Sequence, residues 1–315
     1  MRWPLLIIAI LAASCGRSTP SAPTPVDSIR QSLTTRRIVI YGDSRPAVSG
    51  ESLFMGRRDP VKERALIIEQ IAREKPDLII HSGDLVARGS SEGKWEEWEK
   101  THRPILDARI PFYPALGNHE YVGDNEEALG YFHKRFPALG GCRWYTIKSG
   151  PMLFVMLDSN FDAFDGKEAD REEAWYRKIL KEADVDAEVR AVIVVCHHPP
   201  YTNSKTHGPS EEVRRRFAGP AKECAKFRFF VAGHVHNYER FLIDGVPFVV
   251  SGGGGAPQTA VRTQNYRTDP VYVGPSLRPF HYLVVAVGEK KATVDVMMLQ
   301  SDESWKGGDR FEFDY

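Results

Sequence analysis

The amino-acid sequence predicts an α/β (α+β) fold in which two mixed β-sheets face each other and helices cover their outer sides. In the first two thirds of the chain, short apolar runs typical of buried strands alternate with segments of helical periodicity, as in β-α-β units. Toward the C-terminus, apolar runs follow one another across short turns, as in antiparallel sheets. A chain with both patterns is expected to enclose one core and to gather its functional groups at strand ends.

The alternating part contains strands and helices of ordinary length. We expect strands at residues 37–43, 78–81, 111–116, 145–148 and 152–158, and helices at residues 61–74, 94–106 and 169–183. In the second of these helices, Trp95, Trp98 and His102 recur at helical spacing, which is typical of a packed helix face.

The remaining elements are mainly strands. We expect buried strands at residues 191–196 and 227–232, a hairpin of residues 238–243 and 246–251, and a last antiparallel pair at residues 282–287 and 292–298 that closes the domain. The glycine run 252–255 lacks the lysine and hydroxyl of a phosphate-binding loop. A simple turn is therefore the favoured interpretation of that run.

The N-terminus divides the chain into three parts. Residues 1–15 have the charged-then-apolar order of an export signal, and the sequence before Cys15 is similar to a bacterial lipidation site. The alternative is plain signal cleavage near Ala13. Residues 16–35 are rich in Ser, Thr and Pro and are expected to form a disordered tether before a domain at residues 36–315. We therefore expect an exported protein of the bacterial cell envelope, lipid-anchored in the membrane and facing the periplasm or exterior.

Charge and cysteine content limit the choice of partners. Lysine plus arginine and aspartate plus glutamate each number 42, so no overall field favours nucleic acid, and we expect none as a partner. Three cysteines lie in the body of the chain, an odd number that implies no disulfide framework. Cys196 is a conceivable metal ligand, but a small buried side chain is the favoured interpretation.

Five short polar motifs follow the apolar runs: GDSR, GDL, GNHE, HHPP and GHVH. They bring metal-ligating side chains to strand ends: Asp43, Asp84, Asn118, His119, His197, His234 and His236. Carboxylates bind hard divalent cations, imidazoles suit zinc, iron and manganese, and an amide oxygen adds a neutral ligand. This mixture predicts a site for two adjacent metal ions.

Such a site suits the hydrolysis of phosphate esters. The reaction requires charge neutralisation at phosphorus, a strong nucleophile and a proton for the leaving alkoxide. Two metal ions bridged by a carboxylate meet the first two requirements, and Asp84 is the candidate bridge. His119, beside the candidate ligand Asn118, is the candidate proton donor.

Together and in this order, the motifs resemble those of the calcineurin-like metallophosphoesterase family. GNHE, HHPPY and GHVHNYER are most similar to its purple-acid-phosphatase-like branch, and the resemblance covers nearly all of the chain after Thr35. It implies a four-layer sandwich of two sheets and flanking helices. It also implies a first metal held by Asp43, Asp84 and His236, and a second held by Asp84, Asn118, His197 and His234.

The chain departs from the family pattern at the first metal. The family usually has histidine two residues after the first aspartate, where this chain has Arg45. Purple acid phosphatases place a tyrosine three residues after the second aspartate, where this chain has Ala87, so no purple colour is expected. The first site thus keeps three protein ligands. Arg45 is expected to contact the substrate phosphate, and the alternative is a pair with Asp43 or another carboxylate.

The sequence therefore predicts an exported, metal-dependent phosphoesterase that cleaves small phosphate mono- or diesters by metal-activated hydroxide. One or two divalent ions (Mn, Fe, Zn or Co) are expected as cofactors. The alternative is a non-catalytic metal- or phosphate-binding lipoprotein with a degenerate first site. His198, Tyr201 and His207 follow HHPP on a polar loop, where they line the substrate entrance or have surface roles.

Overall fold

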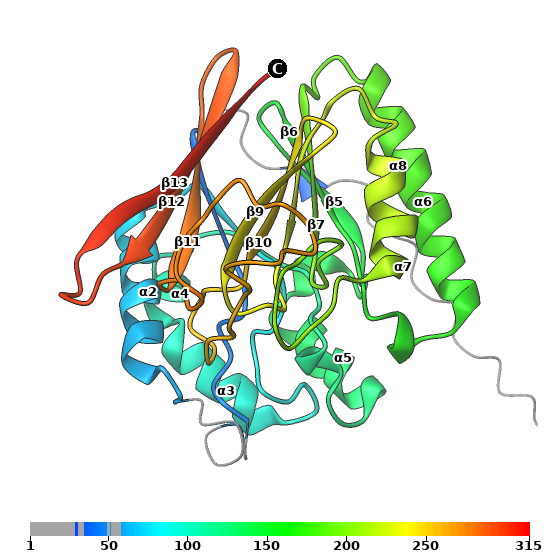
Figure 1. The fold of residues 1–315 in the computed structure, drawn as a ribbon. Helices are drawn as coiled ribbons and strands as arrows, with labels where there is room; N and C mark the ends of the chain where they lie inside the picture. The colour runs from blue at the N-terminus through cyan, green and yellow to red at the C-terminus, as the bar shows by residue number, and fades with distance from the viewer. Residues whose placement is uncertain (1–28, 31–34, 49–50, 52–57) are drawn as a thin grey trace, which may run out of the picture.

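The computed structural model describes residues 29–30, 35–48, 51 and 58–315 (Figure 1). The predicted export signal, Cys15 and most of the predicted tether lie outside the described residues. Within the described part, no helix combines the length and the apolar character needed to cross a membrane.

The structure contains two mixed sheets, as predicted. The seven-stranded sheet has the order β1 (Ile29–Arg30), β5 (Tyr145–Ser149), β6 (Met152–Met156), β7 (Ala191–Cys196), β8 (Phe227–Ala232), β10 (Val246–Ser251) and β9 (Tyr238–Ile243). The six-stranded sheet has the order β13 (Trp305–Asp314), β12 (Lys291–Leu299), β11 (His281–Val287), β2 (Arg37–Tyr41), β3 (Leu78–His81) and β4 (Phe112–Pro114). Strands β6, β7, β8 and β10 of the first sheet are parallel to one another, and so are strands β2, β3 and β4 at one side of the second sheet. The carboxyl ends of each parallel set therefore lie together.

Helices cover the outer faces of both sheets (Figure 1). The main helices are α2 (Val61–Glu74), α3 (Glu92–Thr101), α4 (Arg103–Asp107), α5 (Asn125–Arg135) and α6 (Gly166–Val185). Shorter helical segments are η1 (His119–Tyr121), η2 (Pro137–Leu139), η3 (Phe161–Ala163), α7 (Glu211–Val213), η4 (Arg214–Ala218) and α8 (Gly219–Ala221).

The alternation of side chains along β2 shows how the layers form. Ile38 and Ile40 point into the core between the two sheets, whereas Val39 and Tyr41 belong to a separate cluster with Ile67 of α2. A third cluster fills the space between the seven-stranded sheet and helices α6 to α8. Every β2 residue from Ile38 to Tyr41 is fully buried. This arrangement of helix, sheet, sheet and helix confirms the predicted four-layer sandwich.

The structure also corrects several details of the prediction. The helix expected at residues 94–106 is two helices, α3 and α4, which meet at His102. Pro104 lies in the first turn of α4 and lacks the N–H that a continuous helix would require there. The pair β11 and β12 does not close the domain, since β13 adds a further edge strand. Two residues of the predicted tether form β1, in which Ile29 pairs with Ile147 and packs against the central core.

Candidate metal centre

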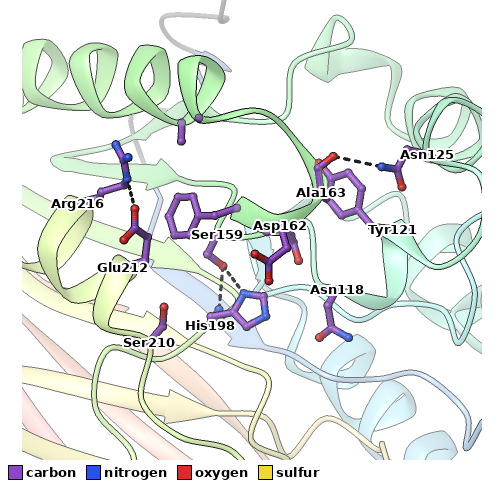
Figure 2. Close-up of a pocket in the computed structure, with 14 residues that line it drawn as sticks. Asn118, Tyr121, Asn125, Ser159, Asp162, Ala163, His198, Ser210, Glu212 and Arg216 are labelled. Atoms are coloured by element: carbon purple, nitrogen blue, oxygen red, sulfur yellow. Dashed lines mark hydrogen bonds and ion pairs between the residues drawn. The ribbon is translucent and has the colours of Figure 1, made fainter.

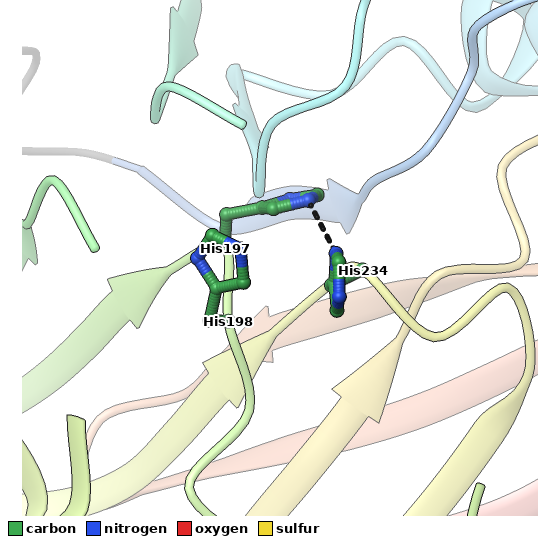
Figure 3. A group of neighbouring side chains, drawn as sticks. All are labelled: His197, His198 and His234. Carbon is green, nitrogen blue, oxygen red and sulfur yellow. Dashed lines mark hydrogen bonds between the residues drawn. The ribbon is translucent and has the colours of Figure 1, made fainter. Parts of the chain in front are cut away.

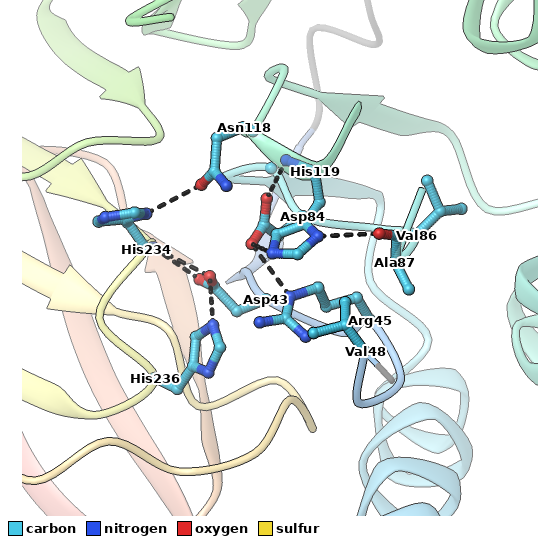
Figure 4. Close-up of polar contacts among 12 residues, drawn as sticks. Asp43, Arg45, Val48, Asp84, Val86, Ala87, Asn118, His119, His234 and His236 are labelled. Carbon is cyan, nitrogen blue, oxygen red and sulfur yellow. Dashed lines mark hydrogen bonds and ion pairs between the residues drawn. The ribbon is translucent and has the colours of Figure 1, made fainter. Parts of the chain in front are cut away.

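The predicted ligands meet where the two sheets present the carboxyl ends of their parallel strands (Figure 4). Asp43 follows β2, Asp84 follows β3, Asn118 follows β4, His197 follows β7, and His234 follows β8. Backbone hydrogen bonds join these loops in pairs: the Asp43 N–H donates to the Gly83 carbonyl at 3.0 Å, and the Gly233 N–H donates to the His197 carbonyl at 3.0 Å. The fold thus brings five distant parts of the sequence to one place.

Three of these residues have left-handed backbone conformations. The φ angles of Asp43, Asp84 and His234 are 59°, 60° and 67°. For a residue with a side chain, this conformation costs about 1–3 kcal/mol, and it persists where the surroundings impose it, often at functional sites. Here each turn directs its side chain back across the strand ends toward the other ligands.

Side-chain atoms of Asn118, His197, His234 and Asp84 form a close group. Asn118 Oδ1 lies 3.1 Å from His197 Nε2 and 3.0 Å from His234 Nδ1, and these two nitrogens lie 3.2 Å apart (Figures 3 and 4). Asp84 Oδ1 lies 3.4 Å from His197 Nε2. His197 Nδ1 donates to the Ser82 carbonyl at 2.9 Å, so Nε2 is the ring nitrogen that faces this group. Oxygen and nitrogen lone pairs that face one another in this way fit a cation between them.

Asp43, Asp84 and His236 form a second group of potential ligands, and their ligand atoms lie within 4.8 Å of one another. His236 Nδ1 donates to the Pro257 carbonyl at 2.6 Å, which leaves Nε2 with its lone pair 3.4 Å from Asp43 Oδ1. Burial lowers the pKa of His236 to about 4, so the ring is neutral at pH 7, the form that ligates metals. The donor set therefore suits a metal ion.

The two carboxylates have different electrostatic surroundings. Burial raises the pKa of Asp43, even though both of its oxygens accept the His234 N–H at 3.0 Å. Burial alone would also raise the pKa of Asp84, but the neighbouring His197, His119 and Arg45 lower it well below its usual range. Asp84 is thus the more acidic carboxyl and belongs to both groups of ligands.

His119 lies at the edge of the cluster, in a fixed orientation. Its Nδ1 donates to the Ala87 carbonyl at 2.9 Å, and its Nε2 lies 3.9 Å from Asp84 Oδ2. Its backbone N–H donates to Asp84 Oδ1 at 3.1 Å. Burial lowers the pKa of His119, while the Asp84 charge acts in the opposite direction. The ring therefore offers a single free nitrogen beside the candidate metal ligands.

Arg45 is buried and forms an ion pair with Glu51. Its two terminal nitrogens donate to the Glu51 carboxylate at 2.9 and 3.0 Å, and its Nε lies 3.4 Å from Asp84 Oδ2. The sequence left open a pair with a carboxylate, but it gave no sign that Glu51 would be the partner. Contact between Arg45 and a substrate phosphate stays a prediction.

Glu120, which was not predicted as a site residue, connects two of the loops that carry candidate ligands. Its carboxylate accepts hydrogen bonds from the backbone N–H groups of Asp84, Leu85, Val86 and Gly117. Burial and the Asp84 charge raise the pKa of Glu120, whereas these N–H groups favour its ionised form. Its place in the GNHE motif, directly after the candidate proton donor, was the available signal.

A cavity of about 660 Å³ opens onto the cluster. Arg45, His119 and His207 line it, and the His207 ring lies 4.6 Å from the His234 ring. Of the other loop residues considered from the sequence, His198 lines a neighbouring cavity, and Tyr201 packs against Phe248 away from the cluster. The glycine run 252–255 is a turn packed on the Asp43 loop, where a Cβ on Gly252 would lie 2.2 Å from the Val235 carbonyl oxygen.

The family model of the calcineurin-like phosphoesterases matches residues 37–238, which is more than half of the chain and includes all of the predicted ligands. The chain belongs to the calcineurin-like phosphoesterase family. At the level of the family, this confirms the prediction of a metal-dependent phosphoesterase.

Individual relatives agree with this assignment. A nucleotide pyrophosphatase/phosphodiesterase of Hordeum vulgare is 24% identical over 286 residues, which cover 76% of this chain and 73% of that protein. Purple acid phosphatase 23 of Arabidopsis thaliana is 24% identical over 255 residues, which cover 67% of this chain and 54% of that protein. The solved structure of purple acid phosphatase PPD1 from yellow lupin (Lupinus luteus) has a TM-score of 0.67 at 21% identity and covers 93% of this chain and 55% of that one. The chain spans about half the length of these two purple acid phosphatases, and it shares the fold of the lupin protein.

Proposed function

We propose that this calcineurin-like phosphoesterase is an exported hydrolase of small phosphate esters that works with two divalent metal ions. The observation that carries the proposed hydrolysis is that side-chain lone pairs of Asn118, His197 and His234 converge. Beside them lies the ring of His119, in which one nitrogen is hydrogen-bonded to the Ala87 carbonyl. When bound, the metal ions would neutralise charge on the phosphoryl oxygens and make water acidic enough to act as a nucleophile.

The side chains of the cluster form two sets of candidate metal ligands. Asp43, Asp84 and His236 would hold one ion, and Asp84, Asn118, His197 and His234 would hold the other. Imidazole and carboxylate donors permit manganese, iron, zinc or cobalt. Because Asp84 belongs to both groups, its carboxylate would be available to both ions.

His119 would supply the proton to the leaving oxygen. The Ala87 carbonyl holds its Nδ1–H, so the proton that moves is the one on Nε2, which faces the cavity. A phosphate ester in the cavity is negatively charged and would favour the protonated ring, as Asp84 already does. At the leaving group, His119 would therefore hold the transferable proton at Nε2.

Hydrolysis assays test this proposal directly. With manganese present, the protein should hydrolyse p-nitrophenyl phosphate, bis-p-nitrophenyl phosphate or both, and Asp84→Asn should abolish the activity. Absence of turnover with every common divalent metal would favour a metal- or phosphate-binding protein instead.

We also propose that the protein is exported and anchored in the membrane by a lipid at Cys15. The support is the order of charged, apolar and small residues before Cys15. In a bacterial host, the protein should fractionate with membranes and require detergent for release, whereas Cys15→Ser should remain in the soluble fraction. Equal fractionation of the two proteins would contradict the anchor.

A further inference from the structure

A second cavity adjoins the metal centre on the side of Asn118 (Figure 2). We call this second cavity the Tyr121 cavity. The first cavity, which Arg45, His119 and His207 line, is called the His119 cavity. Their volumes are about 760 and 660 Å³, within the range of small-molecule sites. Asn118 lines both, and the ring of His198 in the Tyr121 cavity lies 4.5 Å from the ring of His234 in the His119 cavity. The metal centre therefore lies between two cavities.

The walls of the Tyr121 cavity are held in place by polar contacts. The Tyr121 hydroxyl donates to Asp158, which is fully buried, and Arg143 Nε lies 3.7 Å from the same carboxylate. Asn125 Nδ2 donates to the Ala163 carbonyl at 3.2 Å and joins α5 to η3 (Figure 2). A cavity whose walls are already bonded to each other loses little conformational freedom when it binds a ligand.

The charges around the Tyr121 cavity disfavour a second phosphate group. Arg216 is the one lysine or arginine in its described lining, and its guanidinium already pairs with Asp170 at 2.7 Å, Glu173 at 2.8 Å and Glu212 at 2.5 Å. A cation surrounded by three carboxylates has little charge left for an anionic ligand.

Apart from Arg216 and the carboxylates of Glu212 and Asp162, the lining suits a neutral group that contains rings. Phe161 and Tyr121 contribute aromatic rings, and Asn118, Asn125 and Asn160 contribute amides. Aromatic surface with a few amides and hydroxyls is suited to a nucleoside or a similar ring system.

We infer, on the basis of the proposed function, that the preferred substrates are phosphodiesters whose retained substituent is neutral and occupies the Tyr121 cavity. A monoester carries one organic group and would fill only one cavity, whereas a diester carries two. His119 faces the His119 cavity, so the alcohol that it protonates leaves there. In the reaction, the hydroxyl group of water bonds to phosphorus, and the bond from phosphorus to the leaving oxygen breaks. The second proton of water balances the proton that the leaving oxygen receives. The products are an alcohol and a monoester.

Three esters with the same leaving group isolate the retained substituent. They are p-nitrophenyl phosphate, methyl p-nitrophenyl phosphate and thymidine 5′-(p-nitrophenyl phosphate). With the full chain in detergent and manganese present, kcat/KM for the thymidine ester should exceed that for each of the other two by at least about tenfold, since the extra contacts form in a built pocket. Equal kcat/KM values for the thymidine and methyl esters, or the highest value for the monoester, would overturn the inference.

A bulky residue at position 166 tests the location of the substituent. Gly166 lines the Tyr121 cavity, and a Cβ there would meet no atom within 4 Å, so the backbone can accept the Cβ of Gly166→Trp without a clash. It should lower the ratio of kcat/KM for the thymidine ester to that for the methyl ester by about tenfold. Gly130→Trp is the matched control, because Gly130 is equally open, lies in α5 and does not line the cavity. An unchanged ratio in Gly166→Trp would contradict the inference.

Product binding separates this inference from the proposed function. If no ester is hydrolysed, the proposed function fails, and calorimetric titration of the metal-loaded protein with thymidine 5′-phosphate and with methyl phosphate still decides the inference. Tighter binding of thymidine 5′-phosphate that is lost in Gly166→Trp would support the Tyr121 cavity as the substituent site. Equal affinities for the two phosphates would overturn it, whatever the enzyme hydrolyses.

Discussion

Both terminal nitrogens of Arg45 donate hydrogen bonds to the carboxylate of Glu51, at 2.9 and 3.0 Å. The two side chains are only 4% and 7% exposed, so the pair is shielded from water. The pairing also fixes Arg45 Nε at 3.4 Å from Asp84 Oδ2. At the position where the family usually has a histidine ligand, this chain therefore has the positive charge of Arg45, which is paired with the Glu51 carboxylate.

Replacement of Glu51 by glutamine should destabilise the fold. Arg45 would keep its charge but lose the carboxylate that both of its terminal nitrogens contact, which should lower the free energy of unfolding by about 1–3 kcal/mol. Urea denaturation measures the change. The matched control is Glu69→Gln, which removes an exposed pair with Arg73 and should change the free energy of unfolding by less than about 0.5 kcal/mol. Equal effects of the two substitutions would contradict a structural role for the buried pair.

The same pair should make stability depend on pH. Burial alone would raise the pKa of Glu51, but the hydrogen bonds and charge of Arg45 lower it to about 2. A carboxyl whose pKa is lowered by folding stabilises the protein above its unfolded pKa of about 4.3, and this contribution is lost as the pH falls toward the folded value. The difference in unfolding free energy between the parent protein and Glu51→Gln should therefore shrink as the pH falls from 4.5 to 2. A constant difference would show that the Glu51 charge is not involved.

The sequence predicted those elements whose pattern is strong over their whole length. The bounds of α2, β3, β7 and β8 match the prediction because each is bordered by turn residues and is uniformly apolar or clearly periodic. Helix α5 was not predicted, since only Ala128 and Phe132 are buried in it. Strand β13 was not predicted either, because only Phe311 and Phe313 are buried along an otherwise polar edge strand.

The candidate site could be assembled from the sequence because each predicted ligand directly follows a parallel strand. Asp43 and His236 are 193 positions apart, yet they follow strands of the two sheets whose carboxyl ends the fold brings together. Glu51 lies outside any motif, so its pairing with Arg45 depends on the path of the loop rather than on a local pattern. The Tyr121 cavity forms between α5, η3 and η4, whose relative positions only tertiary packing determines.

Removal of metal should lower the unfolding temperature. The cluster gathers Asp43, Asp84 and several imidazole nitrogens at separations of 3.2–3.4 Å, and a cation relieves the repulsion among their lone pairs. A ligand that binds only the folded state at 100 times its Kd adds about 2.7 kcal/mol of stability. Calorimetry before and after EDTA treatment, with manganese then restored, measures the shift. An unfolding temperature that chelation leaves unchanged would argue against a formed metal site.

Glu120 should control metal affinity through the backbone. Glu120→Gln replaces one of the two acceptor oxygens by an NH₂ group that faces backbone N–H donors, so the loops that carry Asp84 and Asn118 lose their common anchor. The free energy of unfolding should fall by at least about 2 kcal/mol, and manganese should bind more weakly. The control is Asp309→Asn, which removes a carboxylate bonded to Tyr238 and Arg240 outside the cluster. That variant should lose stability and keep its manganese affinity, and equal affinity losses would refute the specific role of Glu120.

Asp84→Asn should reduce hydrolysis more than Asp43→Asn. Asp84 Oδ1 lies 3.4 Å from His197, in one ligand group, while Asp84 also belongs to the other group with Asp43 and His236. Asp43 belongs to one group alone, so its amide variant should keep one complete set of ligands. We expect kcat/KM of Asp84→Asn to be at least about tenfold below that of Asp43→Asn, a difference of about 1.4 kcal/mol in activation free energy. Elemental analysis should find less bound metal in Asp84→Asn. Equal residual rates and equal metal contents in the two variants would mean that Asp84 is not shared between two ions.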